Sequence, residues 1–121
     1  MVPGVEKERF TVVERATEGA VILALTGELD HDTAQPLRDA LDAAITPGIR
    51  LLVDLSKLEF CDSTGLNVLL HSRITAQEAD GTLELAGLAG PVARMFRITG
   101  ADGVFPVHAD VEQALSGRQP G

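Results

Sequence analysis

The sequence predicts one α/β domain built on a largely parallel sheet. Short β-branched, apolar segments alternate with longer segments whose apolar residues recur at helical spacing, in the order ββαβαβαβα. Such alternation is typical of right-handed crossovers between parallel strands, here behind an N-terminal hairpin. The chain of 121 residues has the length of one domain and can bury a core without a disulfide or a metal. We expect a mixed, mostly parallel sheet of roughly four to five strands with about four helices.

The start of the chain predicts the hairpin. Segments 10–13 and 20–25 have strand character, and Glu18-Gly19 supplies the turn between them. The second segment is apolar without alternation, which predicts a strand buried on both faces.

The first predicted helix follows a turn at residues 27–30. Asp32 or Thr33 can cap its N-terminus, and the Pro-Gly pair at 47–48 ends it. Its apolar positions form one stripe, which is the pattern of a helix with a single buried face. The stripe consists of Leu37, Ala40, Leu41, Ala44 and Ile45.

The middle of the chain predicts a strand, a loop and a second helix. The strand covers 49–55 and the loop covers 56–61, and the helix runs from the turn at 62–65 to Gln77. The apolar face of this helix is expected to consist of Leu66, Leu69, Leu70 and Ile74.

The last third of the chain completes the alternation with two strands and two helices. These elements are predicted at 82–86, 90–99, 103–107 and 109–115. Residues 1–9 lack periodicity and are expected to be flexible, residues 10–115 form the domain, and residues 116–121 are expected to be a disordered tail.

Composition and charge argue against nucleic-acid binding. The formal net charge is −8, which repels a phosphate backbone, and the ten Lys and Arg residues are scattered, with Arg94 and Arg97 as the densest pair. Aromatic residues make up 3% of the chain, so little material remains for base stacking. We expect no direct contact with nucleic acid. The acidic surface either meets a partner with a positive face or simply aids solubility.

We expect a cytoplasmic protein without a membrane span. Cys61 is the single cysteine, and no secretory signal opens the chain. The longest apolar run is far shorter than the roughly twenty residues of a membrane helix.

The sequence lacks the usual motifs of an enzyme, a metal site or a cofactor site. Neither GxGxxG nor GxxxxGK[ST] occurs, and His31, His71 and His108 lie on different elements without a close-spaced ligand pair. Ser63 lacks the preceding glycine of a G-x-S-x-G elbow, and Cys61 is expected to be buried and unreactive. We therefore expect no enzyme and no cofactor, with a small hydrolase using Ser63 as the alternative.

The turn Asp62-Ser63-Thr64-Gly65 concentrates short polar side chains. Each of its three polar residues is a favoured N-cap, so one of them can serve a purely structural role. Three together also place a hydroxyl and a carboxylate beside free backbone N–H groups at the positive end of a helix dipole. The same position would stabilise a phosphate on Ser63. The residues alone leave both interpretations open.

Three segments of the chain resemble the STAS domain family. They are Gly27–His31 (GELDH), Phe60–Leu66 (FCDSTGL) and Val92–Gly100 (VARMFRITG), and they occur in the family's order. Within that family the chain resembles the free-standing bacterial anti-sigma factor antagonists, and the resemblance runs from about Phe10 to Leu115.

The resemblance implies partner switching without catalysis. The unphosphorylated protein would bind an anti-sigma factor that is also a serine kinase with bound ATP, and a sigma factor would thereby be released. The kinase would phosphorylate Ser63, the complex would dissociate, and a PP2C-type phosphatase would reset the protein. The alternative is a STAS interaction module of another signalling or lipid-transport complex, because such modules share the fold and the turn.

The resemblance also implies roles for single residues. Ser63 matches the phosphoacceptor, and Asp62 matches the adjacent acidic residue that orients the hydroxyl or caps the helix. Thr64 supplies a second hydroxyl, which is a weaker phosphorylation candidate. Gly65 would let the backbone of the partner come close.

Two further positions complete the expected partner-binding surface. Asp30 matches an acidic position that lies near the phosphosite in the family fold, although a turn residue is an equal alternative. Asn67 and Cys61 depart from the family pattern. Because Asn67 lies one turn into the helix, we expect it to tune which anti-sigma factor is recognised.

Overall fold

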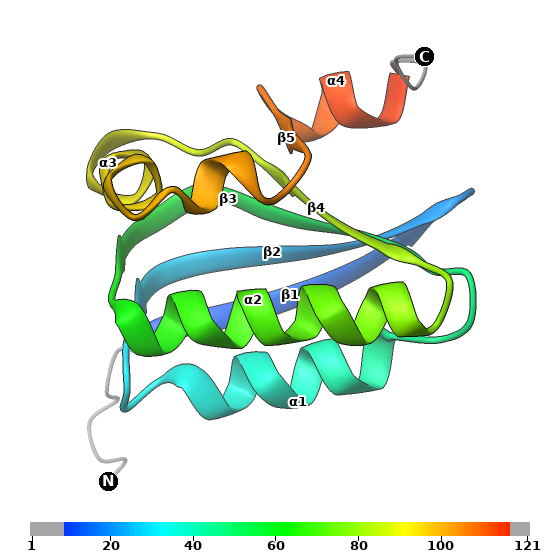
Figure 1. The fold of residues 1–121 in the computed structure, drawn as a ribbon, viewed down its shortest axis with the longest axis horizontal. Helices are drawn as coiled ribbons and strands as arrows, with labels where there is room; N and C mark the ends of the chain where they lie inside the picture. Colours follow the sequence, from blue (N-terminus) through cyan, green and yellow to red (C-terminus); the bar gives the residue numbers. More distant parts are fainter. Residues whose placement is uncertain (1–8, 117–121) are drawn as a thin grey trace, which may run out of the picture.

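The computed structural model describes residues 9–116 and contains a five-stranded sheet in the order β1-β2-β3-β4-β5 (Figure 1). β1 and β2 form the predicted antiparallel hairpin, and all later neighbours pair in parallel. The observed element order confirms the α/β class and the mixed sheet. The strands are β1 (Phe10–Thr17), β2 (Ala20–Leu29), β3 (Arg50–Cys61), β4 (Thr82–Ala86) and β5 (Val107–His108).

Helices cover the sheet from both sides. In Figure 1, α1 and α2 lie side by side on one side of the sheet, and α3 and α4 lie on the other. The helices are α1 (Ala34–Ala44), α2 (Ser63–Glu78), α3 (Gly90–Thr99) and α4 (Val111–Ser116), with a short 3-10 turn, η1 (Ala101–Gly103), after α3. The predicted flexible start and disordered tail fall outside the described residues, apart from Arg9 and Ser116, the last residue of α4.

The main core consists largely of leucine, and its buried side chains come from the sheet, from α1 and α2, and from α3 and the segment that follows it. Leu37 and Leu41 of α1 and Leu69 of α2 are fully buried, and each such side chain contributes about 2 kcal/mol through the area it removes from water. A smaller cluster under α4 contains Ile22, Leu52, Ala86 and Ala114. β2 is therefore covered on both faces, as its unbroken apolar run predicts.

β2 and β3 are longer than the sequence predicts. The expected loop at 56–61 belongs to β3, because its residues continue the parallel pairing with the end of β2 as far as Cys61, which pairs with Leu29. Register shifts interrupt this pairing twice. These irregularities break the strict alternation of buried and exposed residues that a sequence pattern would need to reveal a strand.

The C-terminal part differs from expectation for a similar reason. The predicted strand at 103–107 is replaced by η1 and by β5, which has only two residues. The apolar side chains of Ala101 and Phe105 are buried, so these residues serve as core contacts rather than strand positions. The last helix begins at Val111, two residues later than predicted.

The buried face of α2 is rotated relative to the predicted face. Leu66 and Leu69 are buried as expected, but the side chain of Ile74 is 49% exposed. Ser72 and Ala76 are buried instead. Because α2 packs against both the sheet and α1, small residues occupy the side of the helix that approaches its neighbours most closely.

Candidate functional site

The Asp62–Gly65 turn lies where β3 passes directly into α2. The N–H of Asp62 donates to the carbonyl oxygen of Leu29 at 3.1 Å, so the turn emerges beside the end of β2. Both strands end at the same edge of the sheet because they are parallel. This edge, formed by the carboxyl ends of parallel strands, is where α/β proteins commonly place functional side chains.

Asp62 is the residue that caps α2. Its Oδ1 accepts a hydrogen bond from the Gly65 N–H at 3.0 Å, and its carbonyl oxygen accepts the Leu66 N–H at 3.0 Å. Its Oδ2 accepts the N–H of His31 at 3.3 Å, which ties the β2–α1 loop to the start of α2. Of the three residues that the sequence offers as N-caps, Asp62, Ser63 and Thr64, it is Asp62 whose side chain caps the helix.

Ser63 is free of that structural duty. It is exposed at the first position of the 16-residue helix α2, and Thr64 behind it is half-buried. Within residues 9–116 the Ser63 hydroxyl makes no hydrogen bond to another side chain or to the backbone. The N–H groups of Ser63 and Thr64 belong to the first turn, where a helix has no intrahelical acceptors. An anionic group on the Ser63 oxygen would therefore meet the positive end of the helix.

Gly65 has a reason to be glycine that the sequence did not reveal. It is buried, and a Cβ atom at this position would lie 2.6 Å from Cγ of Leu29 and 3.1 Å from Sγ of Cys61. Gly65 thus lets α2 pack onto the ends of β2 and β3. We expected the missing side chain of Gly65 to leave space for the backbone of a partner, but Leu29 and Cys61 of this protein fill that space.

Cys61 is buried, as predicted. Burial, and after it the neighbouring Asp62 carboxylate, raise the pKa of the Cys61 thiol to about 12. The thiol donates to the carbonyl oxygen of Asp62 at 3.5 Å. Because the nucleophilic form of cysteine is the thiolate, Cys61 is a packing residue at neutral pH.

Asp30 organises the β2–α1 loop. Its Oδ1 accepts the backbone N–H groups of Asp32 at 2.9 Å and Thr33 at 3.1 Å, and its Oδ2 pairs with the Arg9 guanidinium. Burial by itself raises the pKa of the Asp30 carboxyl, but these hydrogen bonds outweigh it and hold the pKa below its usual value. The side chain of Asp30 is therefore engaged as a turn residue, in a loop that contacts the Ser63 turn through His31.

Thr33 occupies the N-cap position of α1 without capping it. In the described part of the chain no side-chain hydrogen bond caps α1, and the Thr33 hydroxyl donates to the carbonyl oxygen of Glu28 at 2.8 Å instead. This hydroxyl thus belongs to the same loop network as Asp30.

Asn67 is exposed on α2, one turn beyond Ser63. It borders a groove of about 380 Å³ between α1 and α2, together with Arg38, Asp42 and His71. Ser63, Asn67 and His71 are spaced four residues apart and lie along one exposed stripe of α2.

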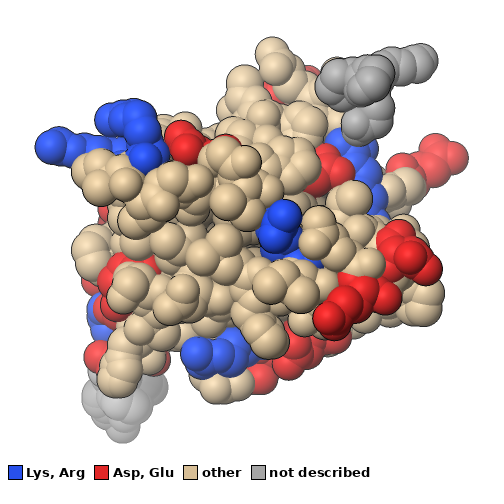
Figure 2. All heavy atoms as spheres, viewed as in Figure 1, with Lys and Arg blue, Asp and Glu red and all other residues tan. Residues whose placement is uncertain are grey.

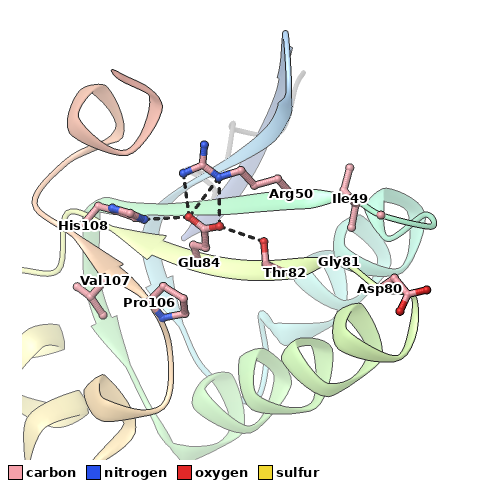
Figure 3. Close-up of a pocket in the computed structure, with 10 residues that line it drawn as sticks. Ile49, Arg50, Asp80, Gly81, Thr82, Glu84, Pro106, Val107 and His108 are labelled. Carbon is pink, nitrogen blue, oxygen red and sulfur yellow. Dashed lines mark hydrogen bonds and ion pairs between the residues drawn. The ribbon is translucent and has the colours of Figure 1, made fainter. Parts of the chain in front are cut away.

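A second polar cluster, which sequence reasoning missed, lies far from the Asp62–Gly65 turn, beside the start of β3 and along β4 (Figure 3). The buried carboxylate of Glu84 accepts hydrogen bonds from Arg50 at 2.9 Å and from Thr82 at 3.0 Å, and lies 2.9 Å from Nε2 of His108. Arg50 also donates to the carbonyl oxygen of Ala114 in α4 at 2.9 Å. The sequence signal was a glutamate between the two leucines of β4, Leu83 and Leu85.

The Glu84 cluster is internally satisfied. Burial by itself raises the pKa of the Glu84 carboxyl, but the hydrogen bonds from Arg50, His108 and Thr82 outweigh it and hold the pKa below its usual value. Within residues 9–116 no buried side-chain nitrogen or oxygen lacks a partner. The cluster borders an open cavity of about 730 Å³, and its contacts join β3, β4, β5 and α4.

The surface charge is unevenly distributed. Figure 2 shows Asp and Glu grouped over the C-terminal ends of α1 and α2, whereas Lys and Arg lie at several separate places, one of them over α3, which contains Arg94 and Arg97. The described residues contain no group of three or more His, Cys, Asp or Glu side chains that could hold a metal ion. Among the helices described here, none is long and apolar enough to cross a membrane.

Comparison with known families identifies the class of protein. The family described as "Mlab, STAS domain" matches residues 12–111, and the chain therefore belongs to the STAS domain family. This match confirms the resemblance of the three sequence segments.

Relatives within the family share the size of the chain. The chain is 32% identical to the anti-sigma-B factor antagonist of Listeria monocytogenes, over 88% of this chain and 92% of that protein. It is 30% identical to the anti-sigma F factor antagonist of Paenibacillus polymyxa, over 81% of this chain and 86% of that protein.

Solved structures show the same fold. An anti-sigma factor antagonist from Mycobacterium paratuberculosis superposes with a TM-score of 0.79 at 29% identity, covering 88% of this chain and 92% of that one. The anti-sigma factor antagonist SpoIIAA in its unphosphorylated form gives a TM-score of 0.70 at 25% identity, covering 87% and 93%. SpoIIAA of Bacillus in its phosphorylated form gives 0.66 at 25% identity, covering 88% and 96%.

Proposed function

We propose that this protein is an anti-sigma factor antagonist whose partner binding is switched by phosphorylation of Ser63. The observation that carries the proposal is that capping and exposure fall on different residues at the start of α2. Asp62 caps the helix, and this leaves the Ser63 hydroxyl exposed beside first-turn N–H groups. The similarity to anti-sigma factor antagonists, over 88% of this chain, supports the same function.

The unphosphorylated protein binds an anti-sigma factor that is also a serine kinase with bound ATP. Exposed Ser63 and Asn67 contact this partner directly, and half-buried Asp62 and Thr64 line the same turn. Asp30 shapes the adjoining loop, and Gly65 acts by letting α2 seat closely against the sheet. Occupation of the anti-sigma factor by this surface releases the sigma factor.

Phosphate transfer joins the Ser63 oxygen to the γ-phosphorus of ATP. The bond between that phosphorus and the bridging oxygen of ADP breaks, and the hydroxyl proton is lost to solvent. The product carries about −1.5 to −2 additional charges next to the Asp62 carboxylate. The helix N-terminus accommodates this charge, so the fold persists. The occurrence of a phosphorylated structure among similar folds, that of SpoIIAA, supports this expectation.

Repulsion at the interface then releases the partner. The new phosphate lies against the phosphate-bearing nucleotide site of the kinase, and like charges in contact at an interface cost several kcal/mol. About 1.4 kcal/mol already lowers affinity tenfold, so no large conformational change is needed. A PP2C-type phosphatase hydrolyses the phosphoserine and restores the binding form. The chain acts as substrate and inhibitor rather than as an enzyme.

The test uses the serine kinase of the anti-sigma class encoded in the same genome, incubated with ATP and this protein. Mass spectrometry should find one phosphate on the wild type and on Thr64→Ala, and none on Ser63→Ala. Equal phosphorylation of Ser63→Ala would refute the proposal. In a binding assay Ser63→Glu should lose at least about tenfold in affinity for the kinase, and tight binding would contradict release by charge repulsion.

A different partner class is the other outcome of this experiment. If the kinase neither binds nor phosphorylates the protein, the chain is better assigned to another signalling assembly or to a lipid-transport complex, because STAS domains in such assemblies have the same fold.

A further inference from the structure

Arg9, the residue before β1, is joined to the end of β2 through both its backbone and its side chain. Its carbonyl oxygen accepts the Glu28 N–H at 2.8 Å, and its guanidinium pairs with Glu28 Oε1 at 3.1 Å and with the Asp30 carboxylate. Gly27 permits this approach, because it has a φ of +98° and a Cβ atom there would collide with the Arg9 carbonyl group. Two separate features therefore hold Arg9 beside the β2–α1 loop.

The β2–α1 loop links Arg9 to the start of α2 through side-chain contacts at each end, Arg9 with Asp30 and His31 with Asp62, joined by the peptide bond between Asp30 and His31. Arg9 holds one oxygen of Asp30, and the other oxygen accepts the N–H groups of Asp32 and Thr33. These contacts shape the loop that presents the His31 N–H to Oδ2 of Asp62 at 3.3 Å. The second oxygen of Asp62 caps α2.

The positive charge of Arg9 also offsets the negative charges of the carboxylates around it. The carboxylates of Glu28, Asp30 and Asp32 lie within five residues of one another, and Arg9 pairs with two of them. Arg9 remains 48% exposed, so its charge acts at the surface that adjoins the turn. Removal of the guanidinium would leave neighbouring carboxylates to repel each other and would loosen the loop.

We propose that Arg9 is a positioning residue for the Ser63 turn: by holding Asp30 it sets the loop whose His31 N–H orients Asp62, and Asp62 fixes the first turn of α2. The role of Ser63 as acceptor rests on the proposed function, whereas the link from Arg9 to α2 does not. Arg9 itself need not touch a partner.

The first experiment measures this link in the protein alone by NMR. Arg9→Gln should shift the backbone amide signals of His31 and Gly65 and speed hydrogen exchange at the Gly65 amide by about threefold or more, because the cap loosens. Arg9→Lys keeps the charge without the planar fork and should restore part of the protection. Arg15→Gln, which removes an exposed arginine of β1 that has no ion pair within residues 9–116, is the matched control and should leave both amides unchanged.

A limited response would overturn the proposal. If Arg9→Gln changes only the signals from Glu28 to Asp32, and the Gly65 amide keeps its wild-type shift and exchange rate, Arg9 stabilises its own loop and nothing more. Melting curves of all variants exclude general unfolding as the cause, and Arg9→Lys provides the same comparison should Arg9→Gln fail to fold.

The second experiment measures phosphate transfer to Ser63 by the kinase described above. Arg9→Gln should lower kcat about threefold to tenfold and change KM less, because misorientation of the acceptor acts on the reaction step. A rise in KM with unchanged kcat would show that Arg9 is a contact residue and would overturn the positioning role. If the wild type gains no phosphate, the proposed function fails, while the NMR comparison still decides the link from Arg9 to α2.

Discussion

The Ser63 turn and the Glu84 cluster are both built around a carboxylate, at opposite ends of β3, but they use it differently. Glu84 is buried and accepts hydrogen bonds from the side chains of three other strand residues (Figure 3). Asp62 accepts two backbone N–H groups, and the hydroxyl beside it stays exposed.

The difference separates a cluster whose polar side chains are all engaged from a turn that keeps an exposed hydroxyl. Within residues 9–116 every buried side-chain nitrogen and oxygen atom has a hydrogen-bond partner, and those of the Glu84 cluster are no exception. The contacts of this cluster therefore stabilise the packing of β5 and α4. In the Ser63 turn one residue performs the structural work, and its neighbour keeps free hydrogen-bonding capacity at a helix N-terminus. Substitutions at the first cluster should therefore affect stability, and substitutions at Ser63 should affect binding.

The largest effect on stability is expected at Glu84. Glu84→Ala leaves the guanidinium of Arg50 without its carboxylate and should lower the free energy of unfolding by about 3 kcal/mol. Urea unfolding followed by circular dichroism measures the change. Glu59→Ala removes an exposed carboxylate of β3 and should stay within about 0.5 kcal/mol of the wild type. Equal effects of the two substitutions would contradict the structural role of the cluster.

Gly65→Ala is expected to have the next largest effect. The added methyl group would press on the fully buried side chain of Leu29, and overpacking of this kind costs about 2 kcal/mol. Gly103→Ala is the control, because a Cβ atom at Gly103 meets no atom within 4 Å. A Gly65→Ala protein as stable as the wild type would show that α2 can move away from the sheet without cost.

Asp62→Ala and Ser63→Ala test whether Asp62 alone caps α2. Loss of the cap in Asp62→Ala should lower the free energy of unfolding by about 1 kcal/mol. Ser63→Ala should change it by less than about 0.5 kcal/mol, because the exposed hydroxyl supports no part of the fold. Thermal unfolding of the two variants side by side measures both values, and the reverse order would mean that Ser63 is the cap.

The smallest expected effect is a difference in acid stability. The pKa of Glu84 is lower in the folded protein than its usual value, so its contribution to stability is present above the unfolded pKa of about 4.3 and is lost as the pH falls through the folded pKa. Unfolding of the wild type and of Glu84→Gln, measured from about pH 6 to about pH 3, should show a shallower decline for the variant. Parallel declines would mean that other carboxyl groups determine acid stability.

Local sequence patterns were sufficient for most of the fold. The apolar stripe of α1, the short strand β4 and the glycine that ends α3 each follow from propensity and spacing, and the structure confirms them. The long ends of β2 and β3 were missed because irregular pairing hides their alternation. The prediction that Ile74 belongs to the apolar face of α2 was wrong, because the orientation of this helix depends on two neighbouring elements at once.

The sequence by itself determined the order of the elements, the buried cysteine and the polar turn before α2. It also carried the family resemblance that pointed to Ser63, because those signals depend only on residues close together along the chain. Only the tertiary structure decided that Asp62 is the cap and that Gly65 packs against Leu29. It also placed Arg9 beside Asp30 and brought Arg50, Glu84 and His108 together. These last contacts join residues from different elements, and their energies depend on burial and distance that no local pattern contains.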